Sequence, residues 1–206
     1  MSLTSRKKRP LSRVNGTLRD ACLIIIATEG KETENQYFEI FHSTRVQIKI
    51  MPTDNGKSSP NHVFERLNEY KKEFELGPSD QLWLMVDTDR WPVRSLSEIA
   101  AESHRKSFQM AVSNPCFELW LYLHCADIGP GQVFIRCDDV EQELRIILGG
   151  YNSSNINIDS FFPHIREAAR RARVLDTNPQ ERWPSNTGTH VYRVVEEILR
   201  LVPNAI

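Results

Sequence analysis

The chain has 206 residues, a net charge of −1 and a hydrophobic fraction of 40%. These values are typical of one substantial globular domain and exclude a fibrous or wholly disordered chain. The longest apolar run, residues 21–27, is too short to span a bilayer, and the basic N-terminus has no apolar segment directly behind it. The sequence therefore favours a cytoplasmic protein without a membrane anchor or a secretory signal.

Four cysteines stand far apart along the chain, and no two of them form a CxxC pair: Cys22, Cys116, Cys125 and Cys137. Three of the four have apolar neighbours in the sequence. This pattern favours buried free thiols in a reducing compartment over disulfides or a zinc site.

Basic side chains gather in two segments. The first 19 residues carry six basic residues and no acid, and we expect this segment to be a disordered tail. A second cluster contains Arg166, Arg170, Arg171 and Arg173. Arg166, Arg170 and Arg173 share one face of a helix, because they are spaced by four and three residues. Both segments are candidates for binding phosphates, and the alternatives are a solvated tail and a solvated helix face.

Strands and helices alternate through the first half of the chain. Residues 21–28 are continuously apolar, as expected of a parallel strand that is buried on both faces. The next expected elements are a helix to about residue 42, a strand at 44–51, a helix at 61–75, a strand at 81–87, a helix at about 95–106 and a strand at 108–113. This order predicts a parallel sheet covered by helices on both faces.

The second half of the chain is mainly helical in pattern. A strongly apolar helix is expected at 117–124, and three amphipathic helices are expected after it, the last at about 191–199. We therefore predict one α/β domain over residues 20–206, with an α/β core at 20–114 and a mainly helical part at 115–206.

Acidic residues follow two of the buried strands. Glu29 comes directly after the first strand, and Asp87 and Asp89 come at the end of the third. Ligands of open parallel sheets bind outside the carboxyl ends of the strands, so these three carboxylates are expected at one edge. Their mutual repulsion would be relieved by a divalent cation, and hard oxygen ligands suit Mg²⁺ or Mn²⁺.

Three segments of the chain resemble the signature blocks of RloB-like proteins: TEGKETENQYF (28–38), LWLMVDTDRW (82–91) and SNPCFELWLYLH (113–124). These are bacterial proteins associated with anti-phage defence and abortive infection, and they have a Toprim-like core. The resemblance implies a Toprim-like central parallel sheet flanked by helices, with metal-dependent phosphodiester chemistry on nucleic acid. Carried over, Glu29 is the Toprim glutamate, and Asp87 and Asp89 are its DxD pair. The chain departs from the family at Trp91, where an acid is common, so its site is less negative.

Other side chains near the strand ends are candidates for the same site. Lys31, Lys57 and Arg90 are candidate phosphate ligands. Glu34 is either a further acidic ligand or an ordinary surface acid. Glu118 is a candidate ligand or general base, and its alternative role is a favourable contact with the dipole of its own helix.

Asn114 and His124 are the last two candidates, and both belong to the third block that resembles RloB-like proteins. Asn114 is expected to cap a helix whose first residue is Pro115, and it is also a candidate for supporting the acidic site. His124 is either a C-terminal helix cap or a general acid or phosphate ligand.

These features predict a metal-dependent nuclease of the Toprim type, which cleaves nucleic acid and favours RNA, with tRNA among its substrates, over DNA. The alternative is a non-catalytic binding or sensor subunit that contacts another protein of a defence system. A Toprim topoisomerase is less consistent with the sequence, because the chain is too short for the accessory domain that carries the nucleophilic tyrosine. The oligomeric state is left open.

Overall fold

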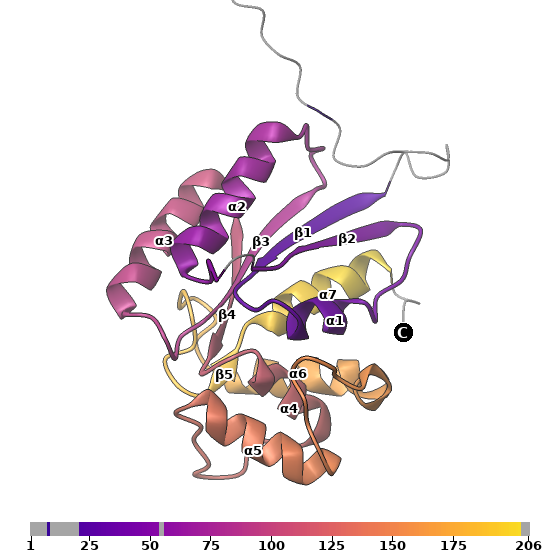
Figure 1. The fold of residues 1–206 in the computed structure, drawn as a ribbon, viewed down its shortest axis with the longest axis vertical. Helices are drawn as coiled ribbons and strands as arrows, with labels where there is room; N and C mark the ends of the chain where they lie inside the picture. The colour runs from indigo at the N-terminus through magenta and orange to yellow at the C-terminus, as the bar shows by residue number, and fades with distance from the viewer. Residues whose placement is uncertain (1–7, 9–20, 54–55, 203–206) are drawn as a thin grey trace, which may run out of the picture.

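The computed structural model describes residue 8 and residues 21–53 and 56–202. Its centre is a five-stranded sheet with the strand order β2-β1-β3-β4-β5 (Figure 1). The strands are β1 (Cys22–Thr28), β2 (Val46–Met51), β3 (Gln81–Asp87), β4 (Gln109–Asn114) and β5 (Gly188–Thr189). The first four strands are parallel, and β5 pairs with β4 in the antiparallel direction.

Seven α-helices surround this sheet in the described part of the chain. They are α1 (Thr33–Phe38), α2 (Pro60–Glu73), α3 (Val93–Lys106), α4 (Glu118–Cys125), α5 (Cys137–Leu148), α6 (Ile165–Leu175) and α7 (Val191–Leu201). Two short 3₁₀ segments, η2 (Ile158–Ser160) and η3 (Phe162–His164), precede α6. None of the described helices is both long and apolar enough to cross a membrane.

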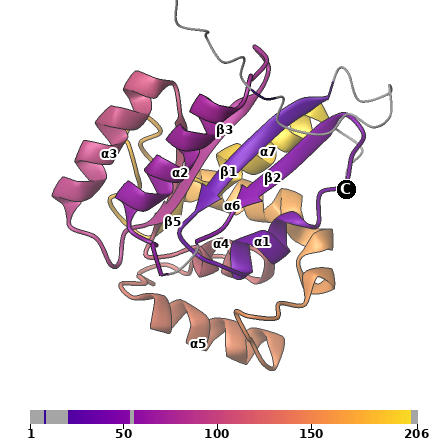
Figure 2. The same ribbon diagram turned by 45° about the horizontal axis from the view of Figure 1, so that its top comes forward.

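The central strands are buried on both faces, which explains why β1 is continuously apolar. Leu23 and Ile25 of β1 pack in one core with residues of α2 and α3. Ile24 and Ile26 point to the other face, into a core shared with α1, α4, α6 and α7. Figures 1 and 2 show the same division, with α2 and α3 on one side of the sheet and α7 on the other.

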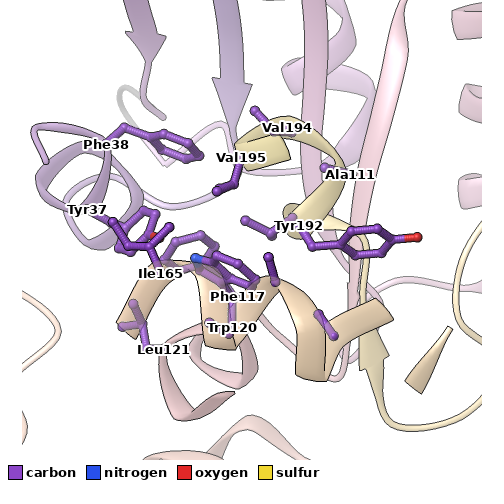
Figure 3. Packing of buried hydrophobic residues seen from close by; sticks show 14 of the residues in the cluster. Tyr37, Phe38, Ala111, Phe117, Trp120, Leu121, Ile165, Tyr192, Val194 and Val195 are labelled. Carbon is purple, nitrogen blue, oxygen red and sulfur yellow. The ribbon is translucent and has the colours of Figure 1, made fainter. Parts of the chain in front are cut away.

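Aromatic side chains connect α1 to the segment that begins α4. The Tyr37 ring of α1 is fully buried and lies edge-on to Phe117 and Trp120, with centroids 5.8 and 6.1 Å apart. Val194 and Val195 of α7 belong to the same core cluster, as Figure 3 shows. This packing fixes the start of α4 against α1, and both elements contribute side chains to the cavity described below.

Local residues set the helix ends. The Ser59 hydroxyl accepts the N–H of His62 at 3.4 Å, and Pro60 occupies the first turn of α2, where its missing N–H costs nothing. Gly149 ends α5 with a φ of 68°, a left-handed conformation that glycine adopts without strain. The signal at Ser59 and Pro60 explains why α2 begins within one residue of its predicted start at residue 61.

The predicted α/β architecture and the parallel order of the first four strands are confirmed. The two-residue strand β5 was not predicted, and α1 ends at Phe38 rather than near residue 42. The fourth helix begins at Glu118, so the prediction that Asn114 caps a helix starting at Pro115 is wrong. The predicted N-terminal tail lies outside the described residues except for Lys8, which forms a parallel bridge with Phe74.

Candidate metal and active site

A cavity of about 190 Å³ lies at the carboxyl ends of β1 and β3, where a parallel sheet offers its binding edge. Six acids appear in its lining: Glu29, Glu34, Asp87, Asp89, Glu118 and Glu141. Arg90 is the one basic side chain among the described lining residues. The cavity therefore brings acidic residues together at the carboxyl edge of the sheet, where the sequence predicted them.

Glu29 is held in a fixed orientation at this edge. Its backbone N–H donates to the Met85 carbonyl at 3.1 Å, which extends the pairing of β1 with β3. Its Oε2 accepts the Asp87 backbone N–H at 3.2 Å, and its Oε1 accepts the indole N–H of Trp91 at 2.7 Å. Burial raises the pKa of Glu29 to about 7, although both hydrogen bonds and the charge of Arg90 oppose this shift.

Asp87 and Asp89 sit at and just beyond the end of β3. The backbone N–H groups of Thr88 and Asp89 donate to the Pro115 carbonyl at 3.2 and 3.3 Å, so the chain after β3 is anchored to the segment before α4. Burial, followed by repulsion from Glu29, raises the pKa of Asp87 well above its ordinary range. Burial also raises the pKa of Asp89, although the neighbouring arginine opposes this shift.

Glu34 reaches the cavity from the first turn of α1. It is 4% exposed, and its Oε1 accepts the backbone N–H of Gly30 at 2.9 Å. A Cβ atom at position 30 would meet the Glu34 carboxylate, so any other residue there would push this carboxylate away from the Gly30 N–H. Glu34 is therefore a buried acid that lines the cavity rather than an ordinary surface residue, and its burial raises its pKa.

Glu118, the first residue of α4, also lines the cavity. It is 9% exposed, and its Oε1 accepts the Tyr151 hydroxyl proton at 3.2 Å. Burial, and then repulsion from Glu34, raises the pKa of Glu118 to about 7. A carboxyl group whose pKa is near neutrality is suited to accept or donate a proton.

The chemistry of this cavity fits a hard divalent cation. Buried carboxylates that repel each other and have little basic counter-charge are stabilised when such a cation binds. The carboxylate oxygens of Glu29, Asp87 and Asp89 do not all lie within 4.8 Å of one another. Among the described residues, potential ligand atoms of Cys116, Glu118 and Cys137 do lie that close together. The three predicted acids share one cavity, but their oxygens do not form one compact ligand set.

A model of the RloB-like protein family matches residues 24–198. The chain belongs to this family. No curated protein and no solved structure gives a significant match. The match confirms the resemblance that the three sequence blocks indicated, and it includes every acid that lines the cavity.

The structure corrects the prediction about the cysteines of this RloB-like chain. Cys116 and Cys137 form a disulfide, with Cα atoms 5.5 Å apart, while Cys22 and Cys125 are free. Both bonded cysteines line the acidic cavity. The prediction of four free thiols is wrong because α5 folds back onto α4, which brings together two residues that are 21 positions apart.

The candidate phosphate ligands occupy different places. Arg90 lines the cavity, whereas Lys31 is exposed and pairs with Glu32 at 3.5 Å. Lys57 is exposed in the loop before α2, and its carbonyl accepts a hydrogen bond from Arg66 at 2.9 Å. Of the three, Arg90 is the one placed to contact a phosphate in the cavity.

The arginines of α6 lie apart from the acidic cavity. Arg166, Arg170 and Arg173 line a separate groove of about 510 Å³ between α6 and α7. Arg170 pairs with Glu167 at 2.6 Å, and Arg173 pairs with Glu196. The predicted shared face exists, but acidic neighbours already offset part of its charge.

His124 and Asn114 do not line the acidic cavity. The Nδ1 of His124 donates to the Trp120 carbonyl at 2.9 Å, so its Nε2 accepts the Tyr37 hydroxyl proton at 3.1 Å. Burial lowers the pKa of His124 to about 3, which makes it a neutral core residue instead of a helix cap or a general acid. The Asn114 amide donates to the Pro184 carbonyl at 3.0 Å and so fixes the segment before β5.

Two residues that position the site acids were not predicted. Trp91 was noted as a departure from the family, yet its indole N–H is the donor that orients Glu29. Tyr151 holds Glu118 from a loop 33 residues further along the chain. Neither role has a local sequence signal, because both depend on long-range packing.

Proposed function

We propose that this RloB-like protein is a metal-dependent nuclease that cleaves phosphodiester bonds of nucleic acid as part of anti-phage defence. RNA, with tRNA among the substrates, is the class that we favour over DNA. The observation that supports the proposal most is the convergence of Glu29, Asp87, Asp89 and Glu118 in one cavity at the carboxyl edge of the sheet. Glu29 and Glu118 are buried there, and buried acids that repel their neighbours are costly to the fold, a cost that is typical of functional sites.

Each residue of the cavity has a defined part in this proposal. Glu29, Asp87 and Asp89 would hold one or two Mg²⁺ or Mn²⁺ ions. A cation bound there supplies Lewis-acid stabilisation of the charge that develops on the scissile phosphate. Arg90 would neutralise a second phosphate oxygen. Glu118, whose pKa is about 7, would accept the proton of the attacking water.

Trp91 and Tyr151 support this chemistry without touching the substrate. The Trp91 indole keeps Glu29 turned toward Asp87, and the Tyr151 hydroxyl fixes one oxygen of Glu118. Fixed carboxylates reduce the reorganisation that the reaction requires.

The test is a cleavage assay with mixed tRNA, single-stranded DNA and duplex DNA, in Mg²⁺ or Mn²⁺ and in EDTA. We expect cation-dependent cleavage that Asp87→Asn reduces by about a hundredfold or more. Asp159→Asn is the matched control, because Asp159 is exposed on η2 and does not line the cavity. Cleavage that persists in EDTA, or that Asp87→Asn leaves unchanged, would rule the proposal out. Cation binding without cleavage of any substrate would favour the sensor subunit.

A further inference from the structure

One wall of the acidic cavity carries a second set of potential ligands with different chemistry. Single atoms of Cys116, Glu118 and Cys137 lie within 4.8 Å of one another, and all three residues line the cavity. Two sulfurs and one carboxylate oxygen form a softer donor set than the carboxylates of Glu29 and Asp87. This set therefore favours a different cation from the one proposed above.

The three ligands are held by two helices that pack against each other. Glu118 is the first residue of α4, Cys116 lies just before it, and Cys137 is the first residue of α5. Val140 and Leu144 of α5 are fully buried in the core that includes α4, so the helix starts stay close without the disulfide. A helix N-terminus also stabilises a thiolate, because the helix dipole places partial positive charge there.

The Glu118 carboxylate provides a second, independent observation. Its Oε1 is satisfied by Tyr151, while the partner of Oε2 outside its own residue, among the described residues, is Cys137 Sγ at 3.3 Å. A sulfur in a disulfide carries no hydrogen, so this contact is not a hydrogen bond in the oxidised protein. The Oε2 atom of this nine-tenths-buried acid therefore lies against a sulfur that cannot donate a hydrogen bond to it in the oxidised protein.

We propose that reduction of the Cys116–Cys137 disulfide creates a binding site for a thiophilic divalent cation such as Zn²⁺. A dithiol reductant supplies two electrons and two protons and becomes a disulfide itself, while the protein S–S bond breaks and two thiols form. The cation then displaces the two thiol protons and is bound by both sulfurs and by Glu118 Oε2.

The geometry of such a site requires only a local change. Zinc–sulfur bonds are about 2.3 Å long in a tetrahedral site, so the two sulfurs would lie about 3.8 Å apart. Half-buried Cys137 can supply this separation, because its side chain borders the cavity. Three protein ligands leave one tetrahedral position, which a water molecule from the cavity can fill.

Cobalt(II) spectroscopy tests this proposal without nucleic acid or activity. The full chain is reduced with a phosphine, which becomes a phosphine oxide by taking its oxygen from water, and is then desalted without oxygen and titrated with Co²⁺. We expect about one equivalent to bind, with a thiolate-to-cobalt charge-transfer band and the intense visible bands of tetrahedral cobalt. Zn²⁺ should displace the cobalt, and the oxidised protein should show no such band.

Variants separate this site from other thiols and from the cavity acids. Cys137→Ser should remove about half of the charge-transfer intensity and weaken Co²⁺ binding at least tenfold, with folding checked by circular dichroism. Glu118→Gln keeps both sulfurs and should weaken binding while the band remains. Cys125→Ser is the control and should behave as the wild type, since Cys125 does not line the cavity.

Two results would overturn the proposal. The first is a reduced wild-type protein that shows no charge-transfer band. The second is a Cys137→Ser variant whose band and affinity match those of the wild type. Neither result depends on the proposed nuclease, which is judged separately by cleavage in Mg²⁺.

Discussion

The acidic cavity and the arginine groove between α6 and α7 differ in how far their charged side chains are paired with opposite charges. The described lining of the cavity has six acids and one basic residue, Arg90, and one of these acids, Glu141, also pairs with Arg145 outside the lining. In the groove between α6 and α7, positive side chains are matched by acids: Arg173 by Glu196, and Arg200 by Glu197 at 2.8 Å.

This difference shows which charges the fold leaves uncompensated. Paired charges on an exposed helix surface are solvated and stabilise the fold little, so they need no ligand. Buried like charges destabilise the folded state until something of opposite charge arrives. A comparison of the two regions therefore places the expected ligand in the cavity, and the following predictions test that conclusion.

The largest expected effect is a loss of stability as the pH rises in metal-free buffer. Glu29 and Glu118 have pKa values of about 7 in the folded protein, above their ordinary value of 4.5. Between these values the folded state holds protons that the unfolded chain has released. The free energy of unfolding should therefore fall as the pH rises from 5.5 to 7.5, by on the order of 3 kcal/mol.

Urea unfolding in EDTA at both pH values measures this effect. Glu29→Gln should remove about half of the pH dependence, because Glu118 still titrates, whereas Glu69→Gln, which changes an exposed residue of α2, should leave it unchanged. Adding Mg²⁺ at pH 7.5 should restore stability in the wild type, because the cation binds the ionised folded state. A pH-independent free energy of unfolding would mean that the cavity acids are solvated like those of the groove.

The next effect concerns Asp87, on which the repulsion of several acids converges. Asp87→Asn removes that charge and should stabilise the metal-free protein at pH 7.5 by about 2 kcal/mol. The melting temperature in EDTA, compared with that of Asp159→Asn, measures the gain. A strong loss of stability would instead identify Asp87 as a structural hydrogen-bonding residue.

The positions of the acids could be predicted because they depend on strand periodicity. The continuous apolar runs of β1 and β3 identify two buried strands, and a parallel arrangement brings the residues that follow them to one edge. Glu29 and Asp87 therefore line the same cavity although they are 58 positions apart.

Other parts of the structure depend on tertiary contacts that leave no pattern in the sequence. The strand β5 has two residues, which is too short for a visible periodicity. The Cys116–Cys137 bond requires the turn between α4 and α5, and spacing alone does not predict a pairing. His124 belongs to an apolar helix, but its neutral state depends on burial, to which other elements such as α1 contribute through Tyr37.

A smaller effect is expected from the residue that orients Glu29. Trp91→Phe keeps an aromatic ring, although a smaller one, and removes the N–H that donates to Oε1 at 2.7 Å. A hydrogen bond to an ionised group contributes about 1.5 kcal/mol, so Mg²⁺ affinity measured by calorimetry should fall about tenfold. The control is Trp183→Phe, which changes a half-buried tryptophan that does not line the cavity. Equal affinities in the two variants would show that Trp91 only packs.

The smallest effect is expected in the arginine groove. If Arg166, Arg170 and Arg173 each contacted a phosphate, replacing all three with glutamine would change the slope of log affinity against log salt by two to three units, since each contact contributes somewhat under one unit. Arg170 and Arg173 are already paired with Glu167 and Glu196, and a phosphate would have to displace those acids.

We therefore expect the triple variant to change the salt slope of nucleic-acid binding by about one unit or less. The measurement is a series of binding titrations with tRNA between low and physiological salt, with cleavage prevented by Asp87→Asn in both proteins. A change of two units or more would mean that the arginines exchange their acidic partners for phosphates. The groove would then be the polyanion-binding surface that complements the acidic cavity, and the contrast between paired and unpaired charge would hold only in the absence of nucleic acid.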